Sequence, residues 1–356
     1  MSESEIDELI GLLGKKYGKV AGRASEVVVA DIPRISTGVF GLDYALGGGV
    51  PVGRITVFYG YKSSGKTTLA SRVVGQAQSL CPRCFGPAGK CGCNFRPFQV
   101  AWIDQEGTYS SEWGKWQGVD NSRLLLVKPE TAEAAVDIID KLIRSGRCDL
   151  IVLDSIAALT PIKETEKSAE EWQQGLAARI VNKGIRRWVT SMNKVFVEEE
   201  LMPTLLLINQ IRMKIGLLYG DPATLPGGMG VQFASSIEVK FWSGKYEMEK
   251  DEEVPKTVEI HYNVTKNKVS VPRMEGSFKM YLREADGRQK GAIAEEAYML
   301  KVGRQLGLIE KAGANWVALK EHTFSSLQAL QNEMVSDMAF RREMHSALLS
   351  ALLALS

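Results

Sequence analysis

The stretch GYKSSGKTT at residues 60–68 limits the possible folds of this chain more than any other part of its sequence. It fits the pattern G-x-x-x-x-G-K-T, follows the apolar run RITVFYG (54–60) and opens a stretch of helical periodicity. A glycine-rich turn between a strand and a helix aims backbone N–H groups at phosphate oxygens, and the helix N-terminus adds a partial positive charge. The sequence therefore predicts a loop that binds the phosphates of a nucleotide; the alternative is a Gly/Ser-rich turn with a solvated lysine.

Each residue type in this loop has a chemical task. Gly60 and Gly65 allow the tight turn, Lys66 reaches the β and γ phosphates, and Thr67 offers a hydroxyl to Mg²⁺. The rest of the predicted nucleotide-binding set lies in the same stretch: Ser63, Ser64 and Thr68. The loop and the first helical turn thus form one predicted binding unit.

Two further predicted strands end in carboxylates. LIVLD (150–154) places Asp154 at a strand end, where it would hold Mg²⁺ through water or, alternatively, cap the next turn. WIDQE (102–106) places Asp104 and Glu106 near the same edge. Glu106 lies beyond the strand, so it is the better candidate to orient and deprotonate a water for hydrolysis. A solvated loop glutamate is the alternative.

Strands that alternate with helices run through the middle of the chain. The predicted buried strands are 54–60, 98–104, 123–129, 150–154 and 204–209, and the predicted helices include 131–146 and about 175–193. This alternation indicates an α/β fold with a largely parallel sheet and helices on both faces. After about residue 230, SSIEVKFW and TVEIHYNV indicate an antiparallel extension, and from about 285 the chain becomes mostly helical.

The chain ends and the overall charge add further expectations. A helix is predicted from about Glu3 to Tyr17, and its apolar face needs a partner in this chain or in a neighbouring copy. LLSALLALS near the C-terminus is expected to pack as a helix on its own domain. No signal peptide and no apolar run of about 18 residues is found, so a cytoplasmic protein without membrane contact is expected. With a net charge of +2, nucleic-acid binding would need a local basic patch.

Four of the five cysteines cluster in CPRCFGPAGKCGC (81–93). Because reducing compartments disfavour disulfides, the cluster indicates a metal site. The predicted ligands of a structural Zn²⁺ are Cys81, Cys84, Cys91 and Cys93. Unliganded surface cysteines and an iron–sulfur cluster are the alternatives. Cys148 precedes a buried strand and is expected in the core.

Several long motifs, in this order, resemble the bacterial RecA recombinase family. They are ISTGVFGLDYALGGGVPVGRITVFYGYKSSGKTT, RSGRCDLIVLDSIAALTP, TLLLINQIRMKIGLLYGDPATLPGG and GLIEKAGANW, and they span almost the whole chain. The resemblance implies a RecA-type P-loop ATPase core with an N-terminal polymerisation helix and a small C-terminal α/β domain. The expected divisions are 1–32, 33–284 with the Cys-rich insertion at 81–93, and 285–356.

The resemblance also implies a function. Such proteins are DNA-dependent ATPases that polymerise as helical filaments on single-stranded DNA, with ATP between protomers, and exchange strands with a homologous duplex. By motif position, Glu106 would activate water and Gln210 would sense the γ phosphate. Lys266 and Lys268 would reach the neighbour's ATP, the alternative being a solvated hairpin.

Two segments are expected to face DNA. The first, 163–174, contains Trp172, which would either stack on a base or pack on its own helix. The helix after it carries a predicted basic stripe, with a merely solvated face as the alternative: Arg179, Lys183, Arg186 and Arg187. For the second segment, 211–230, the resemblance implies that Arg212 contacts phosphate and Ile215 wedges between bases, and Lys214 joins the DNA-binding set.

This chain departs from the family pattern at SAEEWQQ in the first segment and at Met229 in the second. Near the expected adenine pocket stands GTYSSEW, where either Tyr109 or Trp113 is a candidate to stack on the base. Two other functions remain open: a ring-forming DNA motor ATPase, and a DNA-coating filament with little hydrolysis. NQIRMKIG and the C-terminal match argue against the ring, and the intact Lys66, Asp154 and Glu106 argue against weak hydrolysis.

Overall fold

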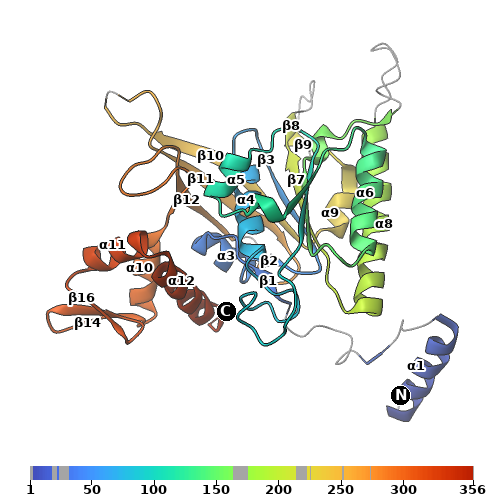
Figure 1. The fold of residues 1–356 in the computed structure, drawn as a ribbon, viewed down its shortest axis with the longest axis horizontal. Coiled ribbons are helices and arrows are strands. Elements are labelled where there is room, and N and C mark those ends of the chain that lie inside the picture. The colour runs from blue at the N-terminus through green and yellow to red at the C-terminus, as the bar shows by residue number, and fades with distance from the viewer. Residues whose placement is uncertain are drawn as a thin grey trace.

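The computed structural model describes residues 3–17, 22–23, 32–162, 175–213, 223–224, 226–250, 252–272 and 274–355. Figure 1 shows a twisted central sheet with helices on both faces, a smaller unit at the C-terminal end, and an N-terminal helix set apart from the rest. The α/β class expected from the sequence is confirmed by this arrangement.

Within the described residues, the central sheet contains nine strands. From one edge to the other they are β13 (Ile293–Ala294), β12 (Glu275–Tyr281), β11 (Thr257–Asn267), β10 (Ile237–Glu247), β3 (Ile55–Gly60), β7 (Thr204–Gln210), β6 (Leu150–Asp154), β4 (Val100–Asp104) and β5 (Leu124–Val127). Neighbours from β10 to β5 run parallel, and the pairs from β10 to β13 are antiparallel. The predicted parallel core and its antiparallel extension are both confirmed.

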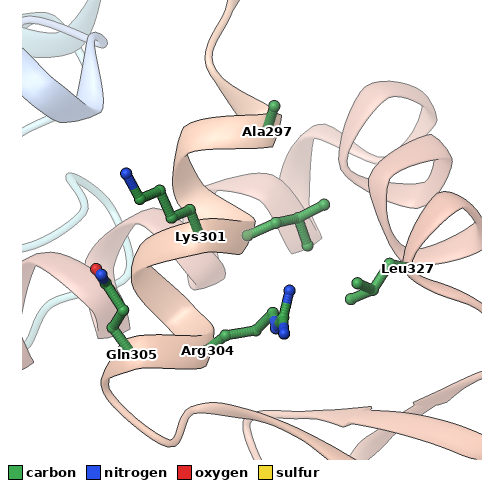
Figure 2. A pocket seen from close by; sticks show the side chains of 6 residues that line it. Ala297, Lys301, Arg304, Gln305 and Leu327 are labelled. Carbon is green, nitrogen blue, oxygen red and sulfur yellow. The ribbon is translucent and has the colours of Figure 1, made fainter.

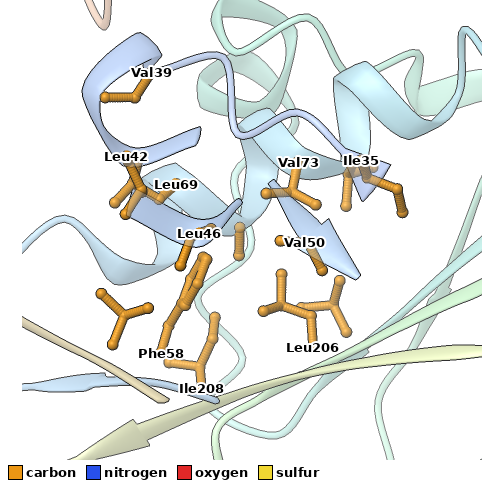
Figure 3. Packing of buried hydrophobic residues seen from close by; sticks show 14 of the residues in the cluster. Ile35, Val39, Leu42, Leu46, Val50, Phe58, Leu69, Val73, Leu206 and Ile208 are labelled. Atoms are coloured by element: carbon orange, nitrogen blue, oxygen red, sulfur yellow. The ribbon is translucent and has the colours of Figure 1, made fainter. Parts of the chain in front are cut away.

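Two hydrophobic layers hold the helices on the sheet, because successive side chains of a strand point to opposite faces. Phe58 of β3 packs in the layer drawn in Figure 3, whereas its neighbour Val57 packs in the layer on the other face. The first layer includes α3 (Phe40–Leu46) and α4 (Lys66–Ala77), and the second includes α6 (Ala132–Arg144), α8 (Leu176–Glu199) and α9 (Gly228–Ala234). Shorter elements of the core are β1 (Arg34–Ile35), β2 (Val50–Pro51), α5 (Ser111–Trp116), η1 (Asn121–Arg123), η2 (Ile156–Ala158), β8 (Arg212–Met213) and β9 (Ala223–Thr224).

The helix α8 is longer than the sequence pattern predicted. It continues past residue 193 to Glu199 and ends where Glu200 adopts a left-handed backbone with a φ of 57°. No glycine or proline occurs between residues 193 and 199, so nothing local stops the helix before that point. Its buried residues, which include Trp188, keep one face against the sheet over most of its length.

The C-terminal unit has its own small core. Its elements are α10 (Glu296–Gln305), β14 (Ile309–Ala312), β15 (Asn315–Ala318), β16 (His322–Phe324), α11 (Leu327–Ser336) and α12 (Met338–Leu353). Leu348 of α12 is buried in this core, and Leu349 and Leu352 pack against it, which confirms the prediction that the apolar C-terminal stretch packs on its own domain. Phe40 of α3 belongs to the same cluster, so this unit shares its core with the central domain. The division after residue 284 stays a prediction.

The N-terminal helix α1 (Glu3–Tyr17) forms over the predicted residues. Its apolar side chains Leu9, Leu12 and Leu13 are exposed, at 47%, 58% and 41% of their full surface. In this chain the helix therefore leaves its apolar face uncovered. Among the described helices, none combines the length and the apolar character needed to cross a membrane.

A buried ion cluster fastens the C-terminal unit to the sheet. Glu296, at 2% exposure, accepts two hydrogen bonds of 2.7 Å from the guanidinium of Arg288. It also pairs with Arg341 of α12, whose guanidinium donates in turn to the carbonyl O of Ile293 in β13. The carboxylate therefore joins Arg288, which precedes β13, to α12, and Arg341 joins α12 to β13 itself.

Replacing Glu296 should weaken this junction strongly. Glu296→Ala leaves two largely buried guanidinium groups without their carboxylate, which costs about 3–5 kcal/mol for a buried pair broken on one side. Urea unfolding followed by circular dichroism measures the effect. Glu333→Ala, at an exposed position of α11, should change stability by less than about 0.5 kcal/mol. Equal stability of the two variants would contradict this account.

Candidate functional site

A cavity of about 370 Å³ lies at the carboxyl ends of the parallel strands β3, β4, β6 and β7. In an open α/β sheet this is the edge where ligands bind. The side chains and backbone that line it come from the glycine-rich loop and three strand ends: Lys62, Ser63, Ser64, Gly65, Lys66, Thr67, Thr68, Glu106, Asp154, Ile208 and Gln210. The structure thus brings together nearly all of the predicted nucleotide-binding residues.

The loop has the backbone shape that phosphate binding needs. A Cβ at Gly60 would lie 2.1 Å from the carbonyl O of Phe241, so only glycine fits between the adjacent strands. Gly65 adopts a φ of 81° directly before α4, and Ser63 a φ of 58°. Both angles lie in the left-handed region, which turns the chain sharply into the helix N-terminus.

The ammonium group of Lys66 is hydrogen-bonded to the glycine-rich loop that precedes it. Its Nζ donates to the carbonyl O of Tyr61 at 2.5 Å and to Ser64 Oγ at 3.2 Å. Burial lowers the pKa of Lys66 to about 8, against the opposing effect of Asp154 and Glu106. A phosphate placed there would add negative charge, raise the pKa of Lys66 again and so favour its charged form.

Thr67 and Asp154 offer the oxygen ligands that Mg²⁺ prefers. Thr67 Oγ1 donates to Asp154 Oδ2 at 3.0 Å, and the carboxyl is 2% exposed. Burial first, and the nearby Glu106 second, raise the pKa of Asp154 to about 7. A divalent cation would relieve this unfavourable burial of charge, so the residues present fit the predicted metal role.

Glu106 points into the cavity and Asp104 does not. Asp104 accepts hydrogen bonds from the backbone N–H groups of Thr108 and Tyr109, both at 3.1 Å, and so caps the turn after β4. Glu106 Oε1 accepts from Gln210 Nε2 and from Ser155 Oγ, each at 2.5 Å. The choice of Glu106 over Asp104, made from their positions relative to the strand, agrees with this geometry.

The contact from Ser155 was missed in the sequence. Asp104 lies opposite Asp154 in the register of β4 and β6, so the residues that follow each of them are neighbours. That register is the signal that points to Ser155. The peptide bond between Asp154 and Ser155 is cis.

Comparison with known proteins decides the family. The model of the RecA N-terminal domain matches residues 4–285. Protein RecA of Wolbachia sp. subsp. Drosophila simulans (strain wRi) is 36% identical over 314 residues, which cover 88% of this chain and 80% of that protein. Protein RecA of Francisella tularensis subsp. novicida (strain U112) is 32% identical over 355 residues, 99% of this chain and 90% of that protein.

The chain belongs to the RecA family. Membership confirms the resemblance seen in the sequence and identifies the chain as an ATP-dependent recombinase with the RecA-type core. The roles of single residues in that activity remain predictions.

The two lysines expected at the RecA protomer interface lie away from the cavity of their own chain. Lys266 Nζ donates to the carbonyl O of Gln232 and to Ser235 Oγ, the latter at 3.1 Å. Lys268 Nζ donates to the carbonyl O of Phe233 at 3.0 Å. Both cations therefore hold the end of α9, and neither is among the residues that line the nucleotide cavity.

All four members of the predicted basic stripe lie on α8. Arg179, Lys183, Arg186 and Arg187 are all exposed, and Arg187 also pairs with Asp137 and Asp140 of α6. Because Asp140 is 1% exposed, Arg187 serves the packing of α6 on α8. Trp172, Lys214 and Ile215 lie outside the described residues, and the backbone of Arg212 belongs to β8.

The two adenine candidates differ in surroundings. Tyr109 packs against Trp102, with its hydroxyl donating to Asn121 Oδ1 at 2.7 Å. Trp113 is half-buried beside the P-loop helix, where its Nε1 donates to Thr68 Oγ1 at 3.0 Å. Trp113 is therefore the better candidate of the two.

The four clustered cysteines meet in space. Their sulfur atoms all lie within 4.8 Å of one another, with Cys81 buried and Cys84 exposed. Cys148 is buried beside its strand, as expected. Four convergent thiols match the donor set of a closed zinc site.

Another hollow, of about 410 Å³, lies in the C-terminal unit beside α10 and the start of α11. Figure 2 shows Arg304 directed into the space toward Leu327, while Lys301 points away. Arg304 also lies over the ring of Trp316, with 5.4 Å from its Cζ to the ring centroid. The residues that line this hollow include no carboxylate.

The raised pKa of Asp154 predicts a stability effect without nucleotide or divalent cation. A carboxyl whose pKa rises from 3.8 to about 7 on folding destabilises the protein increasingly as pH rises between these values. Asp154→Asn removes this titration and should raise the melting temperature, most above pH 7 and less toward pH 4. The exposed Glu130→Gln serves as the control and should show no such gain. A lower melting temperature for Asp154→Asn at pH 8 would contradict the argument.

Proposed function

We propose that this chain is a DNA-dependent ATPase that forms helical filaments on single-stranded DNA and exchanges strands with a homologous duplex. The observation that carries the proposal is the hydrogen bond between Gln210 and Glu106. It joins the residue suited to activating water to the end of β7, from which the chain runs directly into 211–230. One contact therefore connects the site of hydrolysis to a predicted DNA-binding segment.

ATP hydrolysis needs a base that accepts a proton from water and cations that stabilise the developing phosphate charge. Glu106 would accept a proton from the attacking water, and the hydroxyl of Ser155 would hold the Glu106 carboxylate in place. Lys66 would leave the carbonyl O of Tyr61 and bind the β and γ phosphates as negative charge develops. A Mg²⁺ ion bound with ATP would neutralise phosphate charge, and Thr67 and Asp154 would hold this ion. Asp104 is excluded as a competing base because its oxygens cap backbone N–H groups.

Gln210 would respond to the γ phosphate by exchanging partners. Its amide donates to Glu106, and a phosphate oxygen would be a competing acceptor for the same N–H. Since Arg212 follows two residues later in β8, a change at Gln210 would move the start of 211–230. ATP would then favour the state that grips DNA, and hydrolysis would release it.

The filament would complete each site from a neighbouring protomer. Lys266 and Lys268 would turn from the end of α9 toward the neighbour's ATP, where cations stabilise transition-state charge. The uncovered apolar face of α1 would pack on an adjacent copy. A head-to-tail contact of this kind generates a helical polymer.

DNA would bind to a local basic surface, because the net charge of the chain is only +2. Arg179 and Arg186 are exposed on α8, which follows in sequence the segment that contains Trp172. The remaining contacts of the proposal come from 211–230: Arg212, Lys214 and Ile215. A basic groove with apolar wedges binds strands without reading their sequence.

The proposal includes three smaller points. Trp113 would stack on adenine, since it lies beside Thr68 at the entrance of α4. Cys81, Cys84, Cys91 and Cys93 would bind a structural Zn²⁺, which would hold the surrounding turns in place. The protein would act in the cytoplasm, where single-stranded DNA is its partner.

Mixing two inactive variants tests the shared site. Glu106→Gln keeps both lysines and the P-loop but should lose hydrolysis by about 10²–10⁴-fold, and Lys266→Ala/Lys268→Ala keeps Glu106 but should also be nearly inactive. In an equal mixture on single-stranded DNA, about a quarter of the head-to-tail interfaces pair intact Glu106 with intact lysines. The mixture should therefore recover about a quarter of wild-type ATP turnover.

Each variant should still bind a slowly hydrolysed ATP analogue, which separates loss of chemistry from loss of folding. No recovery in the mixture would place the lysines outside the neighbour's site. Undiminished hydrolysis by Glu106→Gln would remove that residue from its proposed role.

A further inference from the structure

The cysteine-bearing segment connects the two elements that build the nucleotide site. α4 begins at Lys66 and Thr67 and ends at Ala77, whereas β4 begins at Val100 and leads at its other end to Glu106. Residues 80–98, called the knuckle from here on, form nearly the whole connection between them. The knuckle thus lies at the far ends of α4 and β4, about 17–18 Å along each element from the phosphate site.

Backbone hydrogen bonds fasten the entry of the knuckle to its exit. The N–H of Phe98 donates to the carbonyl O of Leu80 at 2.9 Å, and the N–H of Ala88 donates to the carbonyl O of Ser79 at 2.8 Å. Leu80 and Pro87 also form an antiparallel bridge. The chain just after α4 is therefore joined to the chain just before β4.

Apolar side chains of the knuckle pack on the sheet core. Phe98 is 1% exposed, and its ring lies 6.1 Å, centroid to centroid, from that of Phe85. Leu80 and Phe85 pack against the layer that contains Val74 of α4 and Trp102 of β4. The position of the knuckle therefore affects the packing of both site-bearing elements.

The cysteine-bearing part of the knuckle has no regular secondary structure to hold its shape. Residues 81–93 contain no helix or strand within the described structure, and the segment is rich in glycine and proline. Its four thiols, by contrast, converge within 4.8 Å. Tetrahedral Zn–S bonds of about 2.3 Å place sulfurs roughly 3.8 Å apart, so a small closing movement completes such a site.

We infer that a thiophilic divalent cation, Zn²⁺ by its donor set, clamps α4 to β4 and thereby strengthens ATP binding at their opposite ends. The inference rests on the zinc site of the proposed function and adds a task to it. Metal and nucleotide are then coupled ligands. Coupling of this kind typically changes affinity by about 5- to 150-fold, and by the same factor in both directions.

The test measures each ligand in the presence of the other, on the full chain. Zinc content is first measured by mass spectrometry. The affinity for a fluorescent, slowly hydrolysed ATP analogue is then measured in the purified protein, after zinc removal, and after zinc is returned. The release of zinc to a chromogenic chelator that is selective over magnesium is measured with and without the analogue. Cys84→Ser removes an exposed ligand, and Lys90→Ala is the matched control in the same knuckle.

One zinc per chain, ATP affinity reduced by about 5- to 150-fold on zinc removal, and recovery on its return are the expected results. Cys84→Ser should match the zinc-free protein and Lys90→Ala the untreated one. If Cys84→Ser does not fold, slower zinc release from the wild type with the analogue bound still supports the coupling.

Other results would overturn the inference. Stoichiometric zinc with unchanged ATP affinity after its removal would keep the metal site and reject the clamp. Absence of zinc binding would reject the metal site itself. A loss confined to single-stranded DNA affinity would make the knuckle a nucleic-acid contact, independent of the nucleotide site.

Discussion

The confinement of two carboxylates and one lysine at the buried edge of a parallel sheet is the constraint on which this structure depends. Lys66 and Asp154 are both nearly inaccessible to solvent. Burial lowers the pKa of Lys66 and raises the pKa of Asp154, and each shift favours the neutral form of the group. Glu106 adds a further negative charge whose position is fixed by Ser155 and Gln210. The site is therefore electrostatically incomplete by itself and is suited to a ligand that brings both phosphate and a divalent cation.

The rest of the fold serves to hold these groups at one edge. Parallel strands bring Asp154, Glu106 and Gln210 to the same end of the sheet, although they lie far apart in the sequence. The two hydrophobic layers fix α4 on one face of the sheet and α8 on the other. The phosphate loop and the basic side chains of α8 are therefore held by the same sheet. Gln210 contacts Glu106 at the end of β7, directly before a segment predicted to bind DNA.

Features that depend on local sequence could be predicted, and features that depend on long-range pairing could not. The P-loop, the apolar strands and the amphipathic helices follow from glycine spacing and periodicity, and the cysteine cluster follows from its spacing. The ion pairs of Arg187 could not be predicted because its partners Asp137 and Asp140 lie about fifty residues earlier, on a helix whose rotation the sequence does not give. For the same reason, the junction around Glu296 and the contact of Ser155 with Glu106 became visible only in three dimensions.

The central claim is that Gln210 couples hydrolysis to DNA, and steady-state ATP turnover with and without single-stranded DNA tests it most directly. The wild type should be stimulated strongly by DNA, whereas Gln210→Ala should bind the ATP analogue normally and turn over ATP at the same low rate with or without DNA. Equal stimulation of the wild type and Gln210→Ala would show that the signal between the nucleotide and DNA takes another route.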